Sequence, residues 1–246
     1  MKKVFIIVPI ALILGVAILA GVLMLIPIEH VTVSGSSYYY PEEIEAAVFT
    51  DEFSRTAFMT YVRSKIGTDA TLPFIDHFDI TMTGLKDAHI HAEPKDVKGY
   101  VSAYGSNIYF NRKGIVTEIS QEVYPGVPLV SGVALQTVAL GAELPIESKS
   151  ILNELTEISQ FISSTKVDMG EGEVTLIEET SRIYFDESEN IYCTIGTITV
   201  RLGIGYNLEG KLEEMAGILP SLAGRTGTLH LEGYDPQDSN HVYLFD

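Results

Sequence analysis

The chain has 246 residues, of which 33 are acidic and 16 are basic, and its formal net charge is −17. Nucleic-acid binders need clustered Lys and Arg for phosphate contacts, so this balance argues against that class. The single cysteine, Cys193, excludes an internal disulfide framework, a cysteine-rich zinc site and a CxxC redox pair. The length allows either one large domain or two small ones.

An apolar segment lies close to the start of the chain. Residues 4–28 carry no charge, and as a helix they would extend about 37 Å against roughly 30 Å of bilayer hydrocarbon. A secretory signal peptide has a shorter apolar stretch and a small-x-small cleavage site. We therefore predict a transmembrane helix over 4–28 that is not cleaved. Lys2 and Lys3 precede it, so residues 1–3 are expected in the cytoplasm and the rest of the chain outside.

A small two-layer domain is predicted over residues 29–96, with the order of elements β-α-α-β-β. Pro41 is typical of a first helical position, and Glu42 and Glu43 are acids in the first turn of that helix. The other expected elements are a strand at 30–35, a helix at 52–66 and strands at 74–82 and 88–92.

A mixed β-sheet domain with two flanking helices is predicted over residues 97–232, and residues 233–246 are expected to form a polar C-terminal tail. Short apolar stretches between turn residues indicate strands at 99–103, 107–111, 115–120, 174–179, 182–185, 191–195, 197–202 and 227–232. The helices are expected at 147–162 and 208–219, with a Pro/Gly-bounded connector at 127–133. The fold class predicted for the whole chain is therefore α+β.

Few residues suggest metal binding. His89 and His91 lie on one face of a predicted strand with Glu93 two residues further, and a fourth ligand such as His77 would complete a site. Spacing fixes no distance between them, and solvated histidines are the simpler interpretation. Residues 186–190 resemble the start of a calcium loop but lack its glycine and its bidentate Glu, which favours a hairpin turn. We therefore predict no metal and no cofactor.

An enzymatic interpretation remains as an alternative. A cell-wall hydrolase would use carboxylates such as Glu178, Glu179 or Asp186 as acid and base, and these would have to converge across a cleft. The sequence contains no GxSxG, HExxH or SxxK motif. Cys193 lies in a predicted strand, where a buried and inert thiol is expected. We therefore predict no catalytic residue and a protein that is not an enzyme.

Several short motifs occur in an order that resembles one bacterial family. They lie at 31–35, 43–44, 99–101, 109–110, 114–116, 128–132, 200–203, 218–222 and 227–231. In this order the chain resembles the cell-division family FtsQ, called DivIB in Gram-positive bacteria, from the apolar segment to about residue 232. Residues 31–35 with 43–44 look like the opening of a POTRA domain, so the resemblance implies a POTRA-like domain over 29–96 and an FtsQ/DivIB-type β domain over 97–232. One departure is the short stretch 1–3, because members of the family often carry a longer cytoplasmic tail.

The resemblance implies a non-enzymatic, bitopic scaffold of the bacterial divisome, held in the plasma membrane at the division septum. It implies partners of the FtsL and FtsB/DivIC types and a role in regulating septal peptidoglycan synthesis. A POTRA-like receptor or chaperone for exported peptides is a second interpretation of the same motifs.

The last predicted strand, 227–232, is the candidate partner site. No later stretch of comparable quality is available to pair with it, so a bare edge would be a template for another chain. The resemblance points the same way, since family members bind their partner at the C-terminal end of the β domain. The expected contacts, including two cations that would attract an acidic segment, are Thr228, His230, Glu232, Tyr234, Arg201 and Lys211. The alternative is that these polar side chains only cover a solvated sheet face.

Overall fold

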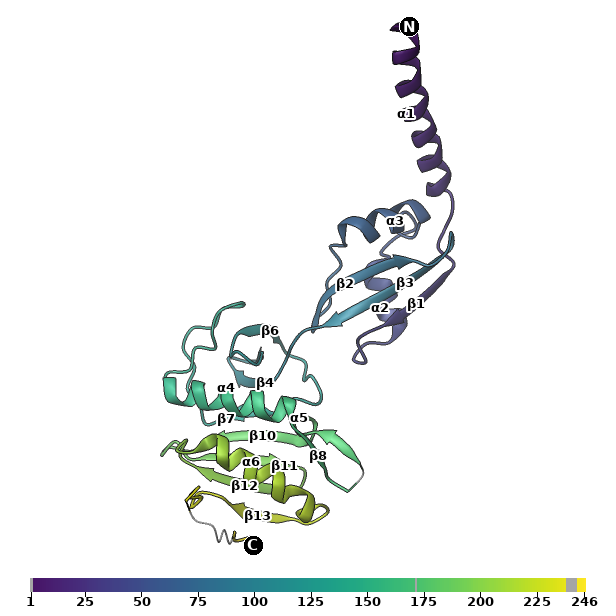
Figure 1. The fold of residues 1–246 in the computed structure, drawn as a ribbon. Coiled ribbons are helices and arrows are strands. Elements are labelled where there is room, and N and C mark those ends of the chain that lie inside the picture. Colours follow the sequence, from purple (N-terminus) through teal and green to yellow (C-terminus); the bar gives the residue numbers. More distant parts are fainter. Residues whose placement is uncertain (1, 171, 238–242) are drawn as a thin grey trace. The chain divides into compact units, whose positions relative to one another are not determined.

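The computed structural model describes residues 2–170, 172–237 and 243–246, with side chains from Pro9 onward. Met1 of the predicted cytoplasmic stretch and residues 238–242 of the predicted tail lie outside the described residues. The chain divides into two compact units, Met1–Lys95 and Asp96–Asp246. Both units combine helices with a sheet (Figure 1), so the fold is α+β as predicted.

The prediction of a transmembrane helix over 4–28 is wrong. Helix α1 (Lys2–Met24) ends before the apolar run does. The last residues of the run belong to the first unit: Ile28 is buried against Ala57, and its amide donates to Arg55 O at 2.8 Å. Within the part of the chain that the structure describes, no helix combines the length and the apolarity needed to cross a membrane.

A three-stranded sheet with two helices on one face forms the first unit. Its elements are β1 (His30–Ser34), α2 (Pro41–Val48), α3 (Ala57–Ile66), β2 (Ile75–Met82) and β3 (Asp87–Pro94). The strand order is β1-β3-β2, with β1 parallel and β2 antiparallel to the central β3. Alternate residues of β2 and β3 are buried and form the core with Ile44 and Val48 of α2. The predicted order β-α-α-β-β is observed.

Helix α3 begins later than the sequence suggested. Thr56 has an extended backbone and its hydroxyl accepts a hydrogen bond from the amide of Met59 at 3.3 Å, as an N-cap residue does. Before it, the side chain of Asp51 accepts a hydrogen bond from the amide of Ser54 at 2.6 Å and closes a turn. The expected helix at 52–66 is therefore shortened to Ala57–Ile66.

The second unit is built on one eight-stranded sheet. Its strands are β4 (Gly99–Ala103), β5 (Ser106–Phe110), β6 (Val116–Ser120), β7 (Leu129–Ser131), β10 (Thr180–Phe185), β11 (Ile191–Ile195), β12 (Ile198–Gly203) and β13 (Gly227–His230). The order is β13-β12-β11-β10-β7-β4-β5-β6, which places β13 and β6 at the two ends. The connector predicted at 127–133 supplies a central strand instead, because β7 lies parallel to both β4 and β10.

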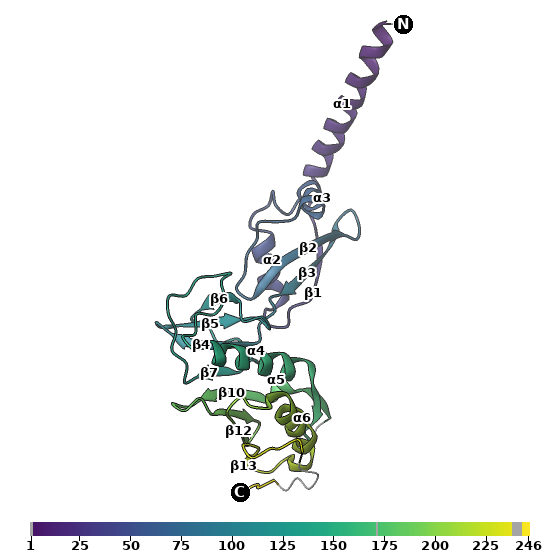
Figure 2. The ribbon, with the colours of Figure 1, turned by 60° about the vertical axis from the view of Figure 1, so that its left-hand side comes forward.

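Helices cover one face of this sheet (Figures 1 and 2). The opposite face, termed the open face, is more exposed at strands β10 to β12, while at β5 residues 122–124 cover Tyr109. The covering elements are α4 (Lys149–Ser164), α5 (Leu176–Glu179), α6 (Leu208–Ile218) and the 3₁₀ turn η1 (Leu219–Leu222). Alternate strand residues such as Ile183, Cys193 and Val200 form the core with these helices. Their neighbours along each strand, such as Tyr192 and Arg201, are more exposed and lie on the open face.

The strand predicted at 174–179 is wrong in its second half. Only Glu173–Thr175 is extended (β9), and it pairs with β8 (Lys166–Asp168) in a small separate hairpin. The chain then makes the single turn of α5, in which Leu176 and Ile177 are both buried. Two consecutive apolar residues can face one core from a helical turn, whereas in a strand they would point to opposite faces.

Candidate functional site

Strand β13 lies at one end of the eight-stranded sheet and pairs with only one named strand. It runs parallel to β12, with Thr199 opposite Thr228 and Arg201 opposite His230. The amides of Thr228 and His230 therefore point outward, while Leu229 is buried in the core. This is the edge at which the sequence predicted partner binding.

The edge is not bare, which corrects the expectation that nothing is available to pair with it. Residues 243–246, termed the cover segment, lie antiparallel along β13, with Phe245 opposite Leu229. The Thr228 amide donates to Asp246 O at 2.6 Å, the Asp246 amide donates back at 3.2 Å, and the His230 amide donates to Leu244 O at 3.0 Å. Both views of the ribbon show the C-terminal end of the chain beside β13 (Figures 1 and 2).

Phe245 and Tyr243 are the apolar side chains by which the cover segment contacts the core of the second unit. Phe245 packs, partly buried, against the core that Leu229 completes. The guanidinium of Arg225 lies 4.5 Å from the centre of its ring, within cation–π distance. A side chain at Gly227 would collide, since a Cβ there would lie 2.8 Å from the Phe245 ring and 2.5 Å from Asp246 O. The glycine is therefore what allows the segment to approach so closely.

A charged cluster lies on the open face beside this edge. His230 Nδ1 is 3.0 Å from Glu232 Oε1, and its Nε2 is 3.2 Å from Asp246 Oδ1. Arg201 Nε is 3.7 Å from the same oxygen of Glu232. The hydrogen bond to Glu232, and then that to Asp246, raise the pKa of His230. Burial works to raise the pKa of Glu232, but the hydrogen bond from His230 and the charge of Arg201 leave it lowered.

The structure brings together four of the six predicted contact residues. Thr228, His230, Arg201 and Glu232 lie on or beside the open face at this edge. Tyr234 lies elsewhere: a Cβ at Gly210 of α6 would be 2.8 Å from its ring, so the tyrosine packs over that helix. The tail beyond β13 turns at this point and carries Tyr234 off the strand face.

Lys211 is the sixth predicted contact, and it is buried instead of facing a partner. Only 2 % of the residue is exposed, and its ammonium donates to Leu202 O at 2.7 Å and to Ile204 O at 2.9 Å. Burial lowers the pKa of Lys211, while the charges of Glu232 and Glu154 act in the opposite direction. Through these two hydrogen bonds the lysine links α6 to the end of β12.

Sequence reasoning missed three residues of this edge and an aromatic row beside it. Arg225 and Gly227 form the seat in which Phe245 of the cover segment lies. No motif joins them to Phe245, because it comes much later in the sequence. On the open face, Tyr184 and Tyr192 contact each other at 5.7 Å between ring centres, and arginines lie over both rings. Alternate residues of β10, β11 and β12 point to the same face, so this row would be visible from the sequence only if the order of the strands in the sheet were known.

The histidines of the first unit form a hydrogen-bonded polar face. The hydroxyl of Ser34 lies 3.0 Å from His89 Nε2 and 2.9 Å from His91 Nδ1, and His91 Nε2 lies 3.1 Å from Glu93. His77 instead pairs with its neighbour Asp76 at 3.0 Å. Among the described residues, no group of three or more His, Cys, Asp or Glu is placed to hold a metal ion.

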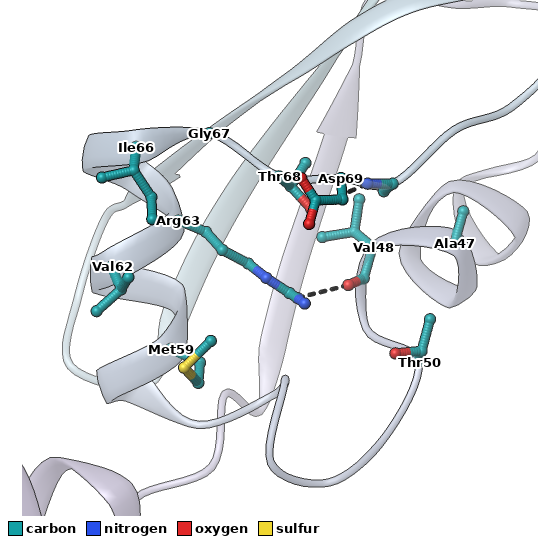
Figure 3. Close-up of a pocket in the computed structure, with 11 residues that line it drawn as sticks. Ala47, Val48, Thr50, Met59, Val62, Arg63, Ile66, Gly67, Thr68 and Asp69 are labelled. Carbon is teal, nitrogen blue, oxygen red and sulfur yellow. Dashed lines mark hydrogen bonds between the residues drawn. The ribbon is translucent and has the colours of Figure 1, made fainter.

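A cavity of about 370 Å³ lies in the first unit between the end of α2, helix α3 and residues 67–70 (Figure 3). Arg63 crosses it and donates from Nη1 to Val48 O at 2.6 Å. A cation at the last carbonyls of a helix is a common stabilising cap. This cap accounts for Arg63, and the rest of the lining combines apolar side chains with the oxygens of Thr50, Thr68 and Asp69.

The carboxylates considered for an enzyme do not converge. Glu178 and Glu179 lie in α5, Asp186 follows the far end of β10, and the six residues of β10 separate them. An extended strand of that length spans about 20 Å, whereas paired glycosidase carboxyls lie roughly 5–9.5 Å apart. Asp186 closes a hairpin turn, accepting from the amides of Ser188 at 2.8 Å and Asn190 at 2.9 Å.

Cys193 is fully buried in β11, and burial raises its pKa to about 12. Its thiol is therefore protonated at neutral pH and poorly nucleophilic.

Comparison of the chain with models of protein families and with curated proteins gave no match.

Proposed function

We propose that this protein is a non-enzymatic docking protein whose β13 edge binds an extended segment of a partner by strand addition. The observation that carries the proposal is the cover segment itself. Residues 243–246 lie antiparallel on β13 and take both outward amides, Thr228 and His230. An edge that accepts one short strand from its own chain has the geometry to accept another from a partner.

The order of sequence motifs supports a role in bacterial division. It resembles the FtsQ/DivIB family, so the proposed partners are FtsL- and FtsB/DivIC-type proteins and the proposed place of action is the division septum. There the protein would help to regulate septal peptidoglycan synthesis as a scaffold, through binding alone.

The side chains beside the edge favour a partner segment that carries an acidic residue. Arg201 and His230 lie on the open face where alternate residues of an added strand would point. In the cover segment, the carboxylate of Asp246 occupies this position and lies 3.2 Å from His230 Nε2. Backbone hydrogen bonds would supply affinity, and this charge pairing would supply register and selectivity.

Co-purification with the proposed partners tests the function. His230→Pro removes one outward donor without touching the ladder to β12, because the His230 amide points to Leu244 O. We expect it to lose FtsB/DivIC-type partners that the wild-type chain retains, while His230→Ala, which keeps the amide, binds within a few-fold of wild type. Circular dichroism shows whether both variants are folded.

Wild-type recovery of the partners by folded His230→Pro would exclude the edge as the binding site. A fluorescent fusion of the full chain tests the septal role independently, since a midcell ring is expected and a uniform distribution would contradict it.

A further inference from the structure

We propose that the cover segment, residues 243–246, is an intramolecular competitor that must leave β13 before a partner strand can bind. The competition rests on the proposed function for the identity of the partner, but the opening of the edge does not. Two strands would then bind this edge in turn, the cover segment of the same chain and a strand of the partner.

Direct occupancy is the first step of the argument. Strand β13 has two amides that point away from β12, those of Thr228 and His230, and the cover segment accepts from both. A partner strand on the same edge needs the same two donors. Because each amide has one hydrogen to donate, the two occupants exclude each other.

Weak attachment is the second step. Leu244 is 57 % exposed and Asp246 is also exposed, while Tyr243 and Phe245 pack against the core but are only partly buried. Segments with few buried apolar contacts and exposed backbone hydrogen bonds open locally at a small fraction of the global unfolding free energy. None of the four residues of the cover segment is fully buried, so the segment can leave while the sheet beneath it stays folded.

Equivalence of the two bound states is the third step. A partner strand with an apolar side chain opposite Leu229 would fill the seat between Arg225 and Gly227 that Phe245 vacates. That side chain would then pack against the same part of the core as Phe245 does when the cover segment is bound. The measured affinity would be the partner's intrinsic affinity multiplied by the fraction of chains whose edge is open.

Amide hydrogen exchange of the purified full chain tests whether the segment opens. We expect the amides of Thr228 and His230 to exchange at least about a hundredfold faster than that of Val200 in the buried β12. In Phe245→Ala, and in a chain shortened to end at residue 242 as a second variant, both amides should lose their remaining protection. The matched control is Leu244→Ala, which removes an exposed side chain and should leave exchange unchanged. Equal protection of Thr228, His230 and Val200 would overturn the proposal.

Titration with a FtsB/DivIC-type partner tests the competition. Phe245→Ala should lower the apparent Kd about tenfold relative to the wild-type chain and Leu244→Ala, because it raises the open fraction. Equal affinity of all three chains for a partner that does bind would overturn the proposal. Fast exchange at Thr228 and His230 with no partner binding to any chain would leave the opening established and contradict the proposed function instead.

Discussion

Other parts of the chain pair with both end strands of the eight-stranded sheet, at the first residue of β6 and along β13, but they are held in different ways. At the β6 end, Val116 exchanges backbone hydrogen bonds with residues 141–142, donating to Ala142 O and accepting from the Gly141 amide, both at 2.8 Å. At the β13 end, the cover segment makes a similar set of backbone bonds. Behind the β6 cover, Leu144 is 1 % exposed within the core, whereas the apolar contacts of the cover segment come from Tyr243 and Phe245, which are only partly buried.

The difference shows that backbone pairing alone does not decide whether an edge is permanently closed. A hydrogen bond that water can replace contributes only about 0.5–1.5 kcal/mol net. Full burial of a leucine side chain contributes about 1.5–3 kcal/mol more. The β6 cover is therefore anchored in the folded core, and the β13 cover is the one that, in our proposal, leaves to admit a partner.

Removal of the deep anchor at the β6 end should have the largest effect on stability. Leu144→Ala is expected to lower the free energy of unfolding by about 2–5 kcal/mol, because it leaves a cavity in the core. Urea denaturation followed by circular dichroism measures the change. The matched control is Leu140→Ala in the same loop, where the side chain is exposed and the change should stay within about 0.5 kcal/mol. A loss at Leu144 as small as that of the control would remove the distinction between the two ends.

Filling the seat of the cover segment should open the β13 end without unfolding the sheet. Gly227→Ala places a methyl group against Asp246 O and the Phe245 ring, so the segment should be displaced and the His230 amide should exchange at least about tenfold faster. Hydrogen exchange measures this, and the free energy of unfolding should change by less than about 1 kcal/mol. Gly217→Ala in α6 is the control, since a Cβ there meets nothing within 4 Å. Unchanged exchange at His230 would mean that the segment tolerates the methyl group in place.

A smaller effect is expected from pH. The charged groups around His230 are Glu232 and Asp246, with Arg201 of β12 beside Glu232, and the two carboxylates raise the pKa of His230. The ordinary pKa of histidine is about 6.5, so below that pH the imidazole is protonated and its interaction with Asp246 is strongest. This stabilisation is lost as the pH rises through the raised pKa of His230. Exchange protection of the His230 amide, corrected for intrinsic rates, should be greater at pH 6 than at pH 8. In His230→Gln the difference should vanish, and its persistence would point to another titrating group.

Much of the second unit could be predicted because its strands alternate. Ile191–Ile195 and Gly99–Ala103 have the bounds expected from the sequence, since each is closed by a turn that the local sequence encodes. The cover segment could not be predicted in this way. Its three apolar residues, 243–245, form too short a run to alternate, and their pairing depends on β13 lying at the end of the sheet, which is a property of strand order.

The candidate site was predictable in part for the same reason. Thr228 and His230 follow from alternation along one strand, and Arg201 follows from the neighbouring strand. Lys211 was misplaced because its burial depends on two carbonyls at the end of β12, Leu202 O and Ile204 O, that no pattern within a helix reveals. The apolar run at 4–28 was misread because the sequence does not show that Ile28 packs into the first unit.

Locking the cover segment to β13 tests the central claim most directly. Thr228 and Asp246 form a hydrogen-bonded pair across the two strands, for which a Cα separation of about 5.5 Å suits a disulfide. In the double variant Thr228→Cys/Asp246→Cys, the native Cys193 is buried and stays out of the reaction. We predict that the oxidised chain does not bind a FtsB/DivIC-type partner and that reduction of the same sample restores binding. Equal binding by the oxidised and reduced chains would show that the partner does not use this edge.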